Sequence, residues 1–129
     1  MTDLIFVYGT LLDAENKYGV YLRDNSKFFS SAKLKGKLFD LGDYPGVVLY
    51  PDGSDWVHGV LLQMDDPKTV LDVLDIYEGF GKDQPQPNEF IRVLAEEAET
   101  DLGFVSCWVY VYNLSLENVP QITSGNYHG

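Results

Sequence analysis

Cysteine and positive charge are both scarce in this sequence. Cys107 is the only cysteine, which excludes an internal disulfide bond and a cysteine-rich zinc site. Nine lysine and arginine residues stand against twenty aspartate and glutamate residues, so the net charge is -11. Because binding to phosphates needs lysine and arginine, this balance argues against nucleic acid or an anionic membrane as a partner. It does not exclude a small anionic substrate held by local backbone donors.

Long apolar stretches are also missing. No segment approaches the roughly 20 apolar residues of a membrane-spanning helix. The N-terminus has no basic flank followed by an apolar stretch of signal-peptide length, so we expect a cytoplasmic protein. The segment Gly79-Phe80-Gly81 follows a predicted helix rather than a strand and therefore does not indicate a phosphate-binding loop. We expect no cofactor and no metal.

The residues that are present suit one globular domain spanning residues 1–129. At a length of 129 residues, folding buries about two thirds of the surface of the unfolded chain. Apolar residues make up 45% of the chain, which argues against disorder. The many tyrosine and phenylalanine residues favour a β-rich fold.

Most of the predicted elements are strands. Alternating or continuous apolar runs, bounded by turn residues, predict strands at Leu4–Tyr8, Phe28–Leu41, within Gly42–Gly53, and at Trp56–Met64, Phe90–Ala95 and Phe104–Tyr112. Gly36, inside the second of these, suggests a bulge or a close approach of another backbone. The acidic segment Glu96–Gly103 is interpreted as a hairpin connection, and Asp13–Asn25 has room for one or two helical turns.

One helix is predicted in detail, from Pro67 to Glu78. Asp66 is a suitable N-cap, proline is tolerated at the first helical position, and Gly79 can end the helix. At about 100° per residue, Glu78 falls on the flank of the apolar face, one turn after Leu74. A carboxylate there, at the negative end of the helix dipole, would have a raised pKa. The alternative is that Glu78 turns to solvent or pairs with a cation such as Arg92.

The strand at Leu4–Tyr8 stops abruptly at Gly9 and Thr10. Glycine lets the backbone turn sharply and lets a ligand approach closely. Successive N–H groups in such a turn can point at one carboxylate or oxyanion. An ordinary turn after a buried strand would leave the same pattern.

Seven segments together resemble the gamma-glutamylcyclotransferase-like family of avirulence-induced-gene-like proteins. They are FVYGTLL, DYPGVV, WVHGVLLQM, LDIYEGF, FIRV, WVYVY and ITSGNY, in this order. The resemblance implies an α+β fold, a small mixed but mostly antiparallel β-barrel flanked by a few helices. It also implies that Tyr8, Gly9, Thr10 and Leu11 bind substrate and that Glu78, in the Asp-x-x-Glu-Gly segment, is the catalytic acid and base. Phe90 and Asn126-Tyr127 depart from the family pattern.

The resemblance further implies a reaction. The α-amine of a γ-glutamyl amine, amino acid or peptide attacks its own γ-carbonyl, giving 5-oxoproline and a free amine. The chemistry fits the raised pKa expected of Glu78, because one carboxyl group near neutrality can both take and return a proton. Two alternatives stay open: a binding or interaction domain that keeps the cavity without turnover, and γ-glutamyl transfer or removal with another leaving group.

Other side chains are candidates for the same cavity. Tyr44 precedes a turn that can approach it, and the hydroxyl of Tyr110 can bind the substrate's α-carboxylate if Tyr110 is not simply a core residue. We expect Arg92 to form a structural ion pair, and we expect neither His58 nor His128 to be catalytic. The loop after Glu78, over residues 81–88, is either a lid or a plain connection, and a homodimer is possible.

Overall fold

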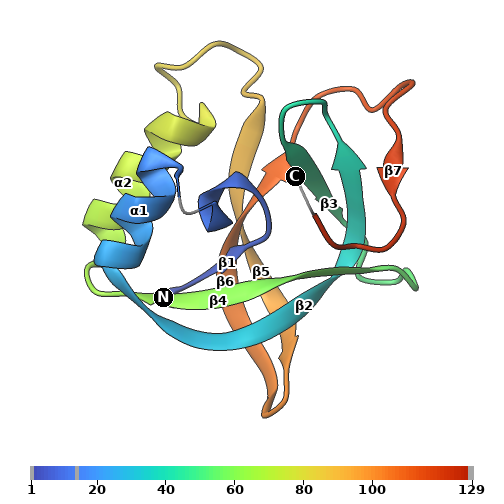
Figure 1. The fold of residues 1–129 in the computed structure, drawn as a ribbon. Coiled ribbons are helices and arrows are strands. Elements are labelled where there is room, and N and C mark those ends of the chain that lie inside the picture. Colours follow the sequence, from blue (N-terminus) through green and yellow to red (C-terminus); the bar gives the residue numbers. More distant parts are fainter. Residues whose placement is uncertain (1, 14, 128–129) are drawn as a thin grey trace.

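A single long strand organises the fold. The computed structural model describes residues 2–13 and 15–127 (Figure 1). Its elements are β1 (Leu4–Val7), the 3-10 turn η1 (Thr10–Leu12), α1 (Lys17–Asp24), β2 (Ser26–Asp40), β3 (Pro45–Leu49), β4 (Trp56–Met64), α2 (Pro67–Glu78), β5 (Phe90–Thr100), β6 (Gly103–Tyr112) and β7 (Gln121–Ile122). The first half of β2 pairs with β4, and its second half pairs with β3 and β7.

Five of the strands close into a barrel. The order is β2-β4-β1-β6-β5, and β5 returns to β2 through the pair Lys33 and Glu99. The pairing of β1 with β6 is parallel, whereas the other pairings are antiparallel. The predicted α+β class, a mixed but mostly antiparallel β-barrel flanked by helices, is therefore confirmed. The two-residue strand β7 was not predicted, because so short a pairing leaves no periodic signal.

Strand β1 is buried on both faces, which explains its continuous apolar sequence. Leu4, Phe6 and Tyr8 belong to the core inside the barrel. Ile5 and Val7 belong to a second core, which lies under the two helices. Figure 1 shows α1 and α2 side by side on one flank of the barrel. Val7 at the end of β1 and Leu74 near the end of α2 therefore belong to the same core.

Helix α2 begins and ends as predicted. The Asp66 side chain accepts the Thr69 amide at 3.4 Å and the Thr69 hydroxyl at 2.9 Å. Gly79 adopts the left-handed conformation at φ 73°, and the Phe80 amide donates to the Asp75 carbonyl at 2.8 Å. A residue without a Cβ takes this conformation at little cost. The helix thus ends at Glu78, as predicted.

The predicted hairpin between β5 and β6 is present, but its connection is shorter than the predicted Glu96–Gly103. Strand β5 continues to Thr100, β6 begins at Gly103, and the connection is only two residues long. A register shift between Ala95 and Ala98 adds a residue to β5 and turns Ala98 into the core, where it is fully buried. A bulge breaks strict alternation, so the acidic run did not read as a strand.

Gly36 marks a close backbone approach rather than a bulge. A Cβ at this position would lie 2.5 Å from the Val48 carbonyl oxygen, whereas the register shifts lie elsewhere, at Phe28/Ser30 and Ala95/Ala98.

Among the helices over residues 2–13 and 15–127, none has the length and apolar composition needed to cross a membrane.

Candidate functional site

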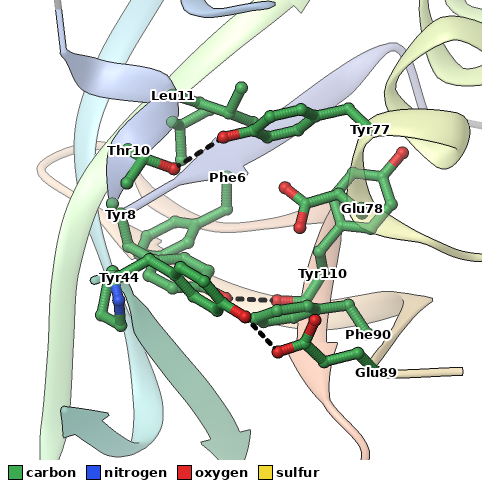
Figure 2. A pocket seen from close by; sticks show the side chains of 13 residues that line it. Phe6, Tyr8, Thr10, Leu11, Tyr44, Tyr77, Glu78, Glu89, Phe90 and Tyr110 are labelled. Carbon is green, nitrogen blue, oxygen red and sulfur yellow. Dashed lines mark hydrogen bonds between the residues drawn. The ribbon is translucent and has the colours of Figure 1, made fainter. Parts of the chain in front are cut away.

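A small pocket lies where the turn after β1, the start of β3, the end of α2 and the start of β5 meet (Figure 2). Its volume is about 190 Å³, which suits a small polar metabolite better than a drug-sized ligand. The lining residues are Phe6, Val7, Tyr8, Gly9, Thr10, Leu11, Tyr44, Pro45, Tyr77, Glu78, Glu89, Phe90 and Tyr110. All seven residues predicted for the site are among them, so the structure brings these distant segments together.

The turn at η1 leaves two backbone donors without a protein acceptor. The Leu12 and Asp13 amides bond to the carbonyls of Gly9 and Thr10 at 2.9 and 3.0 Å. Within the described part of the chain, the Thr10 and Leu11 amides have neither a sheet partner nor a side-chain acceptor. Donors left over at the start of a turn are suited to a carboxylate or an oxyanion.

Gly9 is required by packing and not by its backbone angles. Its φ is -140°, so a left-handed conformation does not explain the glycine. A Cβ on Gly9 would lie 2.7 Å from Cγ and 3.1 Å from Cδ of Pro45. The turn after β1 and the start of β3 are therefore packed directly against each other, which seals one wall of the pocket.

Glu78 carries the electrostatic signature expected of an acid or base. Its side chain points from the last turn of α2 into the pocket (Figure 2). Burial raises the pKa of this carboxyl group to about 8, and the charges of Glu89 and Asp75 add to the shift. Arg92 does not pair with it, so the alternative of a structural Glu78–Arg92 ion pair is contradicted.

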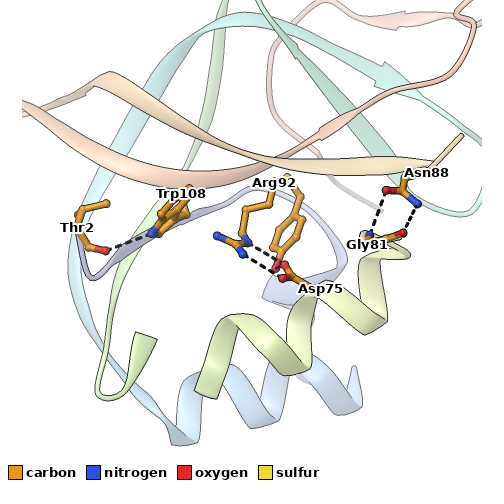
Figure 3. Close-up of polar contacts among 7 residues, drawn as sticks. Thr2, Asp75, Gly81, Asn88, Arg92 and Trp108 are labelled. Carbon is orange, nitrogen blue, oxygen red and sulfur yellow. Dashed lines mark hydrogen bonds and ion pairs between the residues drawn. The ribbon is translucent and has the colours of Figure 1, made fainter. Parts of the chain in front are cut away.

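Asp75, one turn earlier, fastens the end of α2 to the sheet (Figure 3). Its carboxylate accepts Arg92 Nε at 2.8 Å and Arg92 Nη2 at 3.0 Å, and it also accepts the Tyr110 hydroxyl at 2.7 Å. The Arg92 guanidinium lies over the Trp108 ring, 4.7 Å from its centroid. The Asp-x-x-Glu spacing thus places one carboxylate in an anchor and the next in the pocket.

Three predicted tyrosines line the pocket with their hydroxyl groups already hydrogen-bonded. The Tyr8 hydroxyl donates to the Tyr110 carbonyl at 2.6 Å, and the Tyr110 hydroxyl donates to Asp75. The Tyr44 hydroxyl donates to Glu89. Burial raises the pKa of Tyr8 and of Tyr110, so both stay protonated. Contrary to the idea of a free Tyr110 donor for the substrate, that hydroxyl is engaged by the anchor.

Sequence reasoning missed two polar residues of the pocket. The Tyr77 hydroxyl lies 3.1 Å from Thr10 Oγ1 and accepts Asn16 Nδ2 at 3.0 Å, which ties α2 to the η1 turn. Glu89, just before β5, contributes a second carboxylate. In the sequence, Tyr77 has the spacing of the apolar face of the helix, so its hydroxyl gives no separate signal. Glu89 lies in a polar loop segment with no periodicity, and no signal in the sequence could have found it.

Of the other residues discussed above, those that the structure describes do not line the pocket. His58 is exposed in mid-strand, and His128 lies outside the described residues. The loop over residues 81–88 is folded around buried Asn88, whose side chain bonds to both the amide and the carbonyl of Gly81 at 3.1 and 3.0 Å (Figure 3). Cys107 is fully buried.

Comparison with known proteins extends these observations. The Gamma-glutamylcyclotransferase family protein ytfP of Citrobacter rodentium is 34% identical and matches 95% of this chain and 93% of its own length. The solution structure of protein ytfP from Escherichia coli is 28% identical, with a TM-score of 0.67 over 96% of this chain and 95% of that one. YkqA from Bacillus subtilis is 26% identical, with a TM-score of 0.70 over 98% of this chain, which spans only 40% of YkqA.

The family assignment rests on nearly the whole chain. The sequence profile described as Gamma-glutamyl cyclotransferase, AIG2-like matches residues 5–129. This range includes the η1 turn, both carboxylates of the Asp-x-x-Glu segment and every other residue of the pocket. The chain belongs to the gamma-glutamyl cyclotransferase, AIG2-like family.

Proposed function

We propose that this protein is a cyclotransferase that releases 5-oxoproline and a free amine from a γ-glutamyl amine, amino acid or peptide. The observation that carries the proposal is the position of Glu78. A carboxyl group with a pKa of about 8 faces, across a small pocket, a turn in which two backbone amides have no acceptor among the described residues. General acid–base catalysis is most effective when the pKa of the group lies near the working pH.

The substrate's glutamyl end is held by the η1 turn. Its α-carboxylate or its developing oxyanion accepts the Thr10 and Leu11 amides, which are fixed before the substrate arrives. The turn is supported from behind by α1, where Arg23 donates to the Leu11 and Asp13 carbonyls at 3.4 Å each. A preorganised turn lowers the entropy lost when the flexible glutamyl chain adopts its folded, attack-ready shape.

Glu78 moves the proton. Its ionised form takes a proton from the substrate's α-ammonium, and the neutral amine attacks the γ-carbonyl carbon to form the five-membered ring. The protonated Glu78 then donates to the leaving nitrogen as the original amide C–N bond breaks. As the carbonyl forms again, the ring nitrogen gives up its second proton, which the released amine takes up to leave as an ammonium, so the Glu78 carboxylate is regenerated and the reaction balances without any other reactant.

The rival is a binding domain that keeps the pocket without turnover. The phenylalanine at position 90 is the observation in its favour, because the family pattern has a tyrosine there and Phe90 brings no hydroxyl into the pocket. Phe90 packs between Tyr44 and Tyr112, at centroid distances of 6.0 and 5.5 Å, so the ring serves to shape the wall.

A panel of γ-glutamyl amines, amino acids and peptides, assayed for 5-oxoproline, tests the proposal. We expect release from at least one compound, and a fall of roughly a hundredfold or more in the Glu78→Gln variant, the usual weight of a positioned acid and base. The matched control is Glu96→Gln, which removes an exposed carboxylate outside the pocket and should retain activity. Binding of the compounds without 5-oxoproline release would favour the rival function.

A further inference from the structure

We propose that Glu89, held by Tyr44, is a specificity-determining residue that favours a leaving amine carrying positive charge and disfavours one that carries a carboxylate. The inference rests on the proposed function and names the part of the substrate that the sequence left open. It begins from the charges in the pocket. Among the described residues, the thirteen that line the pocket include two carboxyl groups and no lysine, arginine or histidine.

Two arginines are bonded near the pocket, and both are engaged elsewhere. Arg23 donates to the Leu11 and Asp13 carbonyls. The Nε and Nη2 atoms of Arg92 donate to Asp75, and the Arg92 guanidinium lies over the Trp108 ring. The pocket is therefore acidic, although the glutamyl part of the substrate itself brings a carboxylate. The Thr10 and Leu11 amides, beside the Thr10 and Tyr77 hydroxyls, offer that carboxylate a place on one side of the pocket, so the acidic side is left for the other end of the substrate.

The arrangement in Figure 2 gives the substrate a direction. Thr10 lies along one side of the pocket, Glu89 with Tyr44 lies along the other, and Glu78 lies between them. A glutamyl group seated on the Thr10 side, with its amide nitrogen at Glu78, must extend its leaving group toward Glu89. Opposite charges in contact attract even near water, and like charges repel by a similar amount.

Glu89 is held in place rather than loosely exposed. The Tyr44 hydroxyl donates to its Oε2, which leaves Oε1 for a ligand. Its backbone carbonyl accepts the Asn113 amide at 2.8 Å. The preceding residue, buried Asn88, is fixed by bonds to Gly81 and by the Asn113 side chain. A carboxylate whose backbone and one oxygen are both restrained can bind an ammonium group at a small cost in entropy.

Three compounds of equal length measure the effect. They are the γ-glutamyl derivatives of 1,4-diaminobutane, pentylamine and 4-aminobutyrate, which end in an ammonium, a methyl and a carboxylate group. For the unmodified protein we expect kcat/KM to follow that order, with about tenfold or more between the first and the last. Glu89→Gln should bring the three values close together, whereas Glu96→Gln, which changes the net charge equally outside the pocket, should keep the order.

A second variant separates recognition from a purely structural tie between the starts of β3 and β5. Tyr44→Phe removes the hydroxyl and keeps the carboxylate, so the preference for the ammonium should survive it. If the bond is only structural, both variants should lower the melting temperature and neither should change the order. That result would overturn the proposal.

Failure of the proposed function is recognised separately. The affinities of the same three compounds for the Glu78→Gln variant, measured by calorimetry, require no turnover. The ammonium compound should bind most tightly, and Glu78→Gln combined with Glu89→Gln should lose that preference. Equal affinities, or no binding by any of the three, would refute the role of Glu89 whether or not 5-oxoproline is ever released.

Discussion

At the residue scale, the charge of Glu78 links the chemistry of the pocket to the stability of the fold. Burial raises its pKa from an ordinary value of 4.5 to about 8, so the folded protein holds this proton more tightly than the unfolded chain does. Between these two values the unfolded state binds fewer protons. The contribution of Glu78 to stability is therefore fully present below about 4.5 and is lost as pH rises through about 8.

Glu78→Gln should remove this dependence. We expect the variant to be as stable as the parent or more stable at neutral pH, and to lack a decline of up to about 1.4 kcal/mol per pH unit between the two pKa values. Urea unfolding at several pH values, with both proteins side by side, measures the difference. A variant that is clearly less stable at neutral pH and still fully active would contradict the catalytic role.

The same group should shape the pH profile of the reaction. Because only ionised Glu78 can accept the substrate's proton, kcat/KM should rise with pH and bend near 8, the pKa that burial imposes on this carboxyl group. The bend should be absent from the residual activity of Glu78→Gln. A profile that bends near 4.5 in the parent protein would show that the group doing the chemistry is not buried.

Gly9→Val should disturb both binding and folding. The new Cβ would lie 2.7 Å from the Pro45 ring, so either the turn or the start of β3 must move, at a cost of about 1 to 3 kcal/mol. Movement of the turn displaces the Thr10 and Leu11 amides, and affinity for 5-oxoproline, the proposed product, should be lost. Melting temperature and calorimetric affinity on one sample measure the two effects.

Gly53→Val is the matched control for this experiment. A Cβ there would lie 3.2 Å from the Tyr50 Cβ, in a turn that does not line the pocket. It should lower stability and leave affinity unchanged. Equal affinity in Gly9→Val and the parent would mean that the η1 turn presents nothing to the ligand.

At the element scale, helix α2 positions Glu78 through two separate fastenings. The Asp75–Arg92 ion pair holds the last turn against β5, with both side chains less than one fifth exposed. The Tyr77 hydroxyl holds it against the η1 turn. Gly79 then ends the helix, so Glu78 cannot be carried onward by another turn. These contacts fix the last turn of α2, so the Glu78 carboxyl group is held at the pocket.

Asp75→Ala tests whether the Asp75–Arg92 ion pair positions Glu78. Removal of one partner leaves the Arg92 charge without its ion pair in a largely buried position, which should cost about 3 kcal/mol of stability. Turnover should fall as well, mainly in kcat, because Glu78 loses its fixed position although it keeps its carboxyl group. Asp72→Ala, three residues earlier on the same helix, removes the partner of exposed Lys68 and should change neither property. Full activity in Asp75→Ala would remove the positioning role.

At the scale of the whole molecule, the closed barrel makes the two cores depend on each other. Strand β1 contributes alternate residues to the core inside the barrel and to the core beneath the helices. Cys107 lies in the barrel core with no exposed surface, and burial raises the pKa of its thiol to about 12. A buried thiol of this kind is unreactive until the structure opens.

Cys107 therefore reports on opening of the barrel. We expect a thiol reagent to leave the native protein unlabelled over many turnover times and to label it completely in denaturant. Since no second cysteine competes, the slow native labelling rate should follow the stability of the variants above. Rapid labelling of the native protein at neutral pH would show that the barrel opens locally at β6.

The sequence by itself determined the features that depend on neighbouring residues: the ends of α2, the buried strand β1 and the position of Glu78 on its helix. Asp66, Pro67 and Gly79 set the ends of α2 because caps act within one turn. The apolar run at Leu4–Val7 required a strand buried on both sides. The flank position of Glu78 followed from the helical period, and its raised pKa followed from burial at the end of the helix.

Only the tertiary structure decided which distant groups share the pocket. Closure of the barrel places Glu89 across the pocket from Thr10. It also pairs Arg92 with Asp75 rather than with Glu78, and the Tyr110 hydroxyl donates to the same Asp75 carboxylate. These choices depend on strand register and on the bulge in β5, and a bulge adds a residue without leaving a periodic trace. Hydrogen-bond partners far apart in the chain are selected by the closure of the sheet, which no short segment encodes.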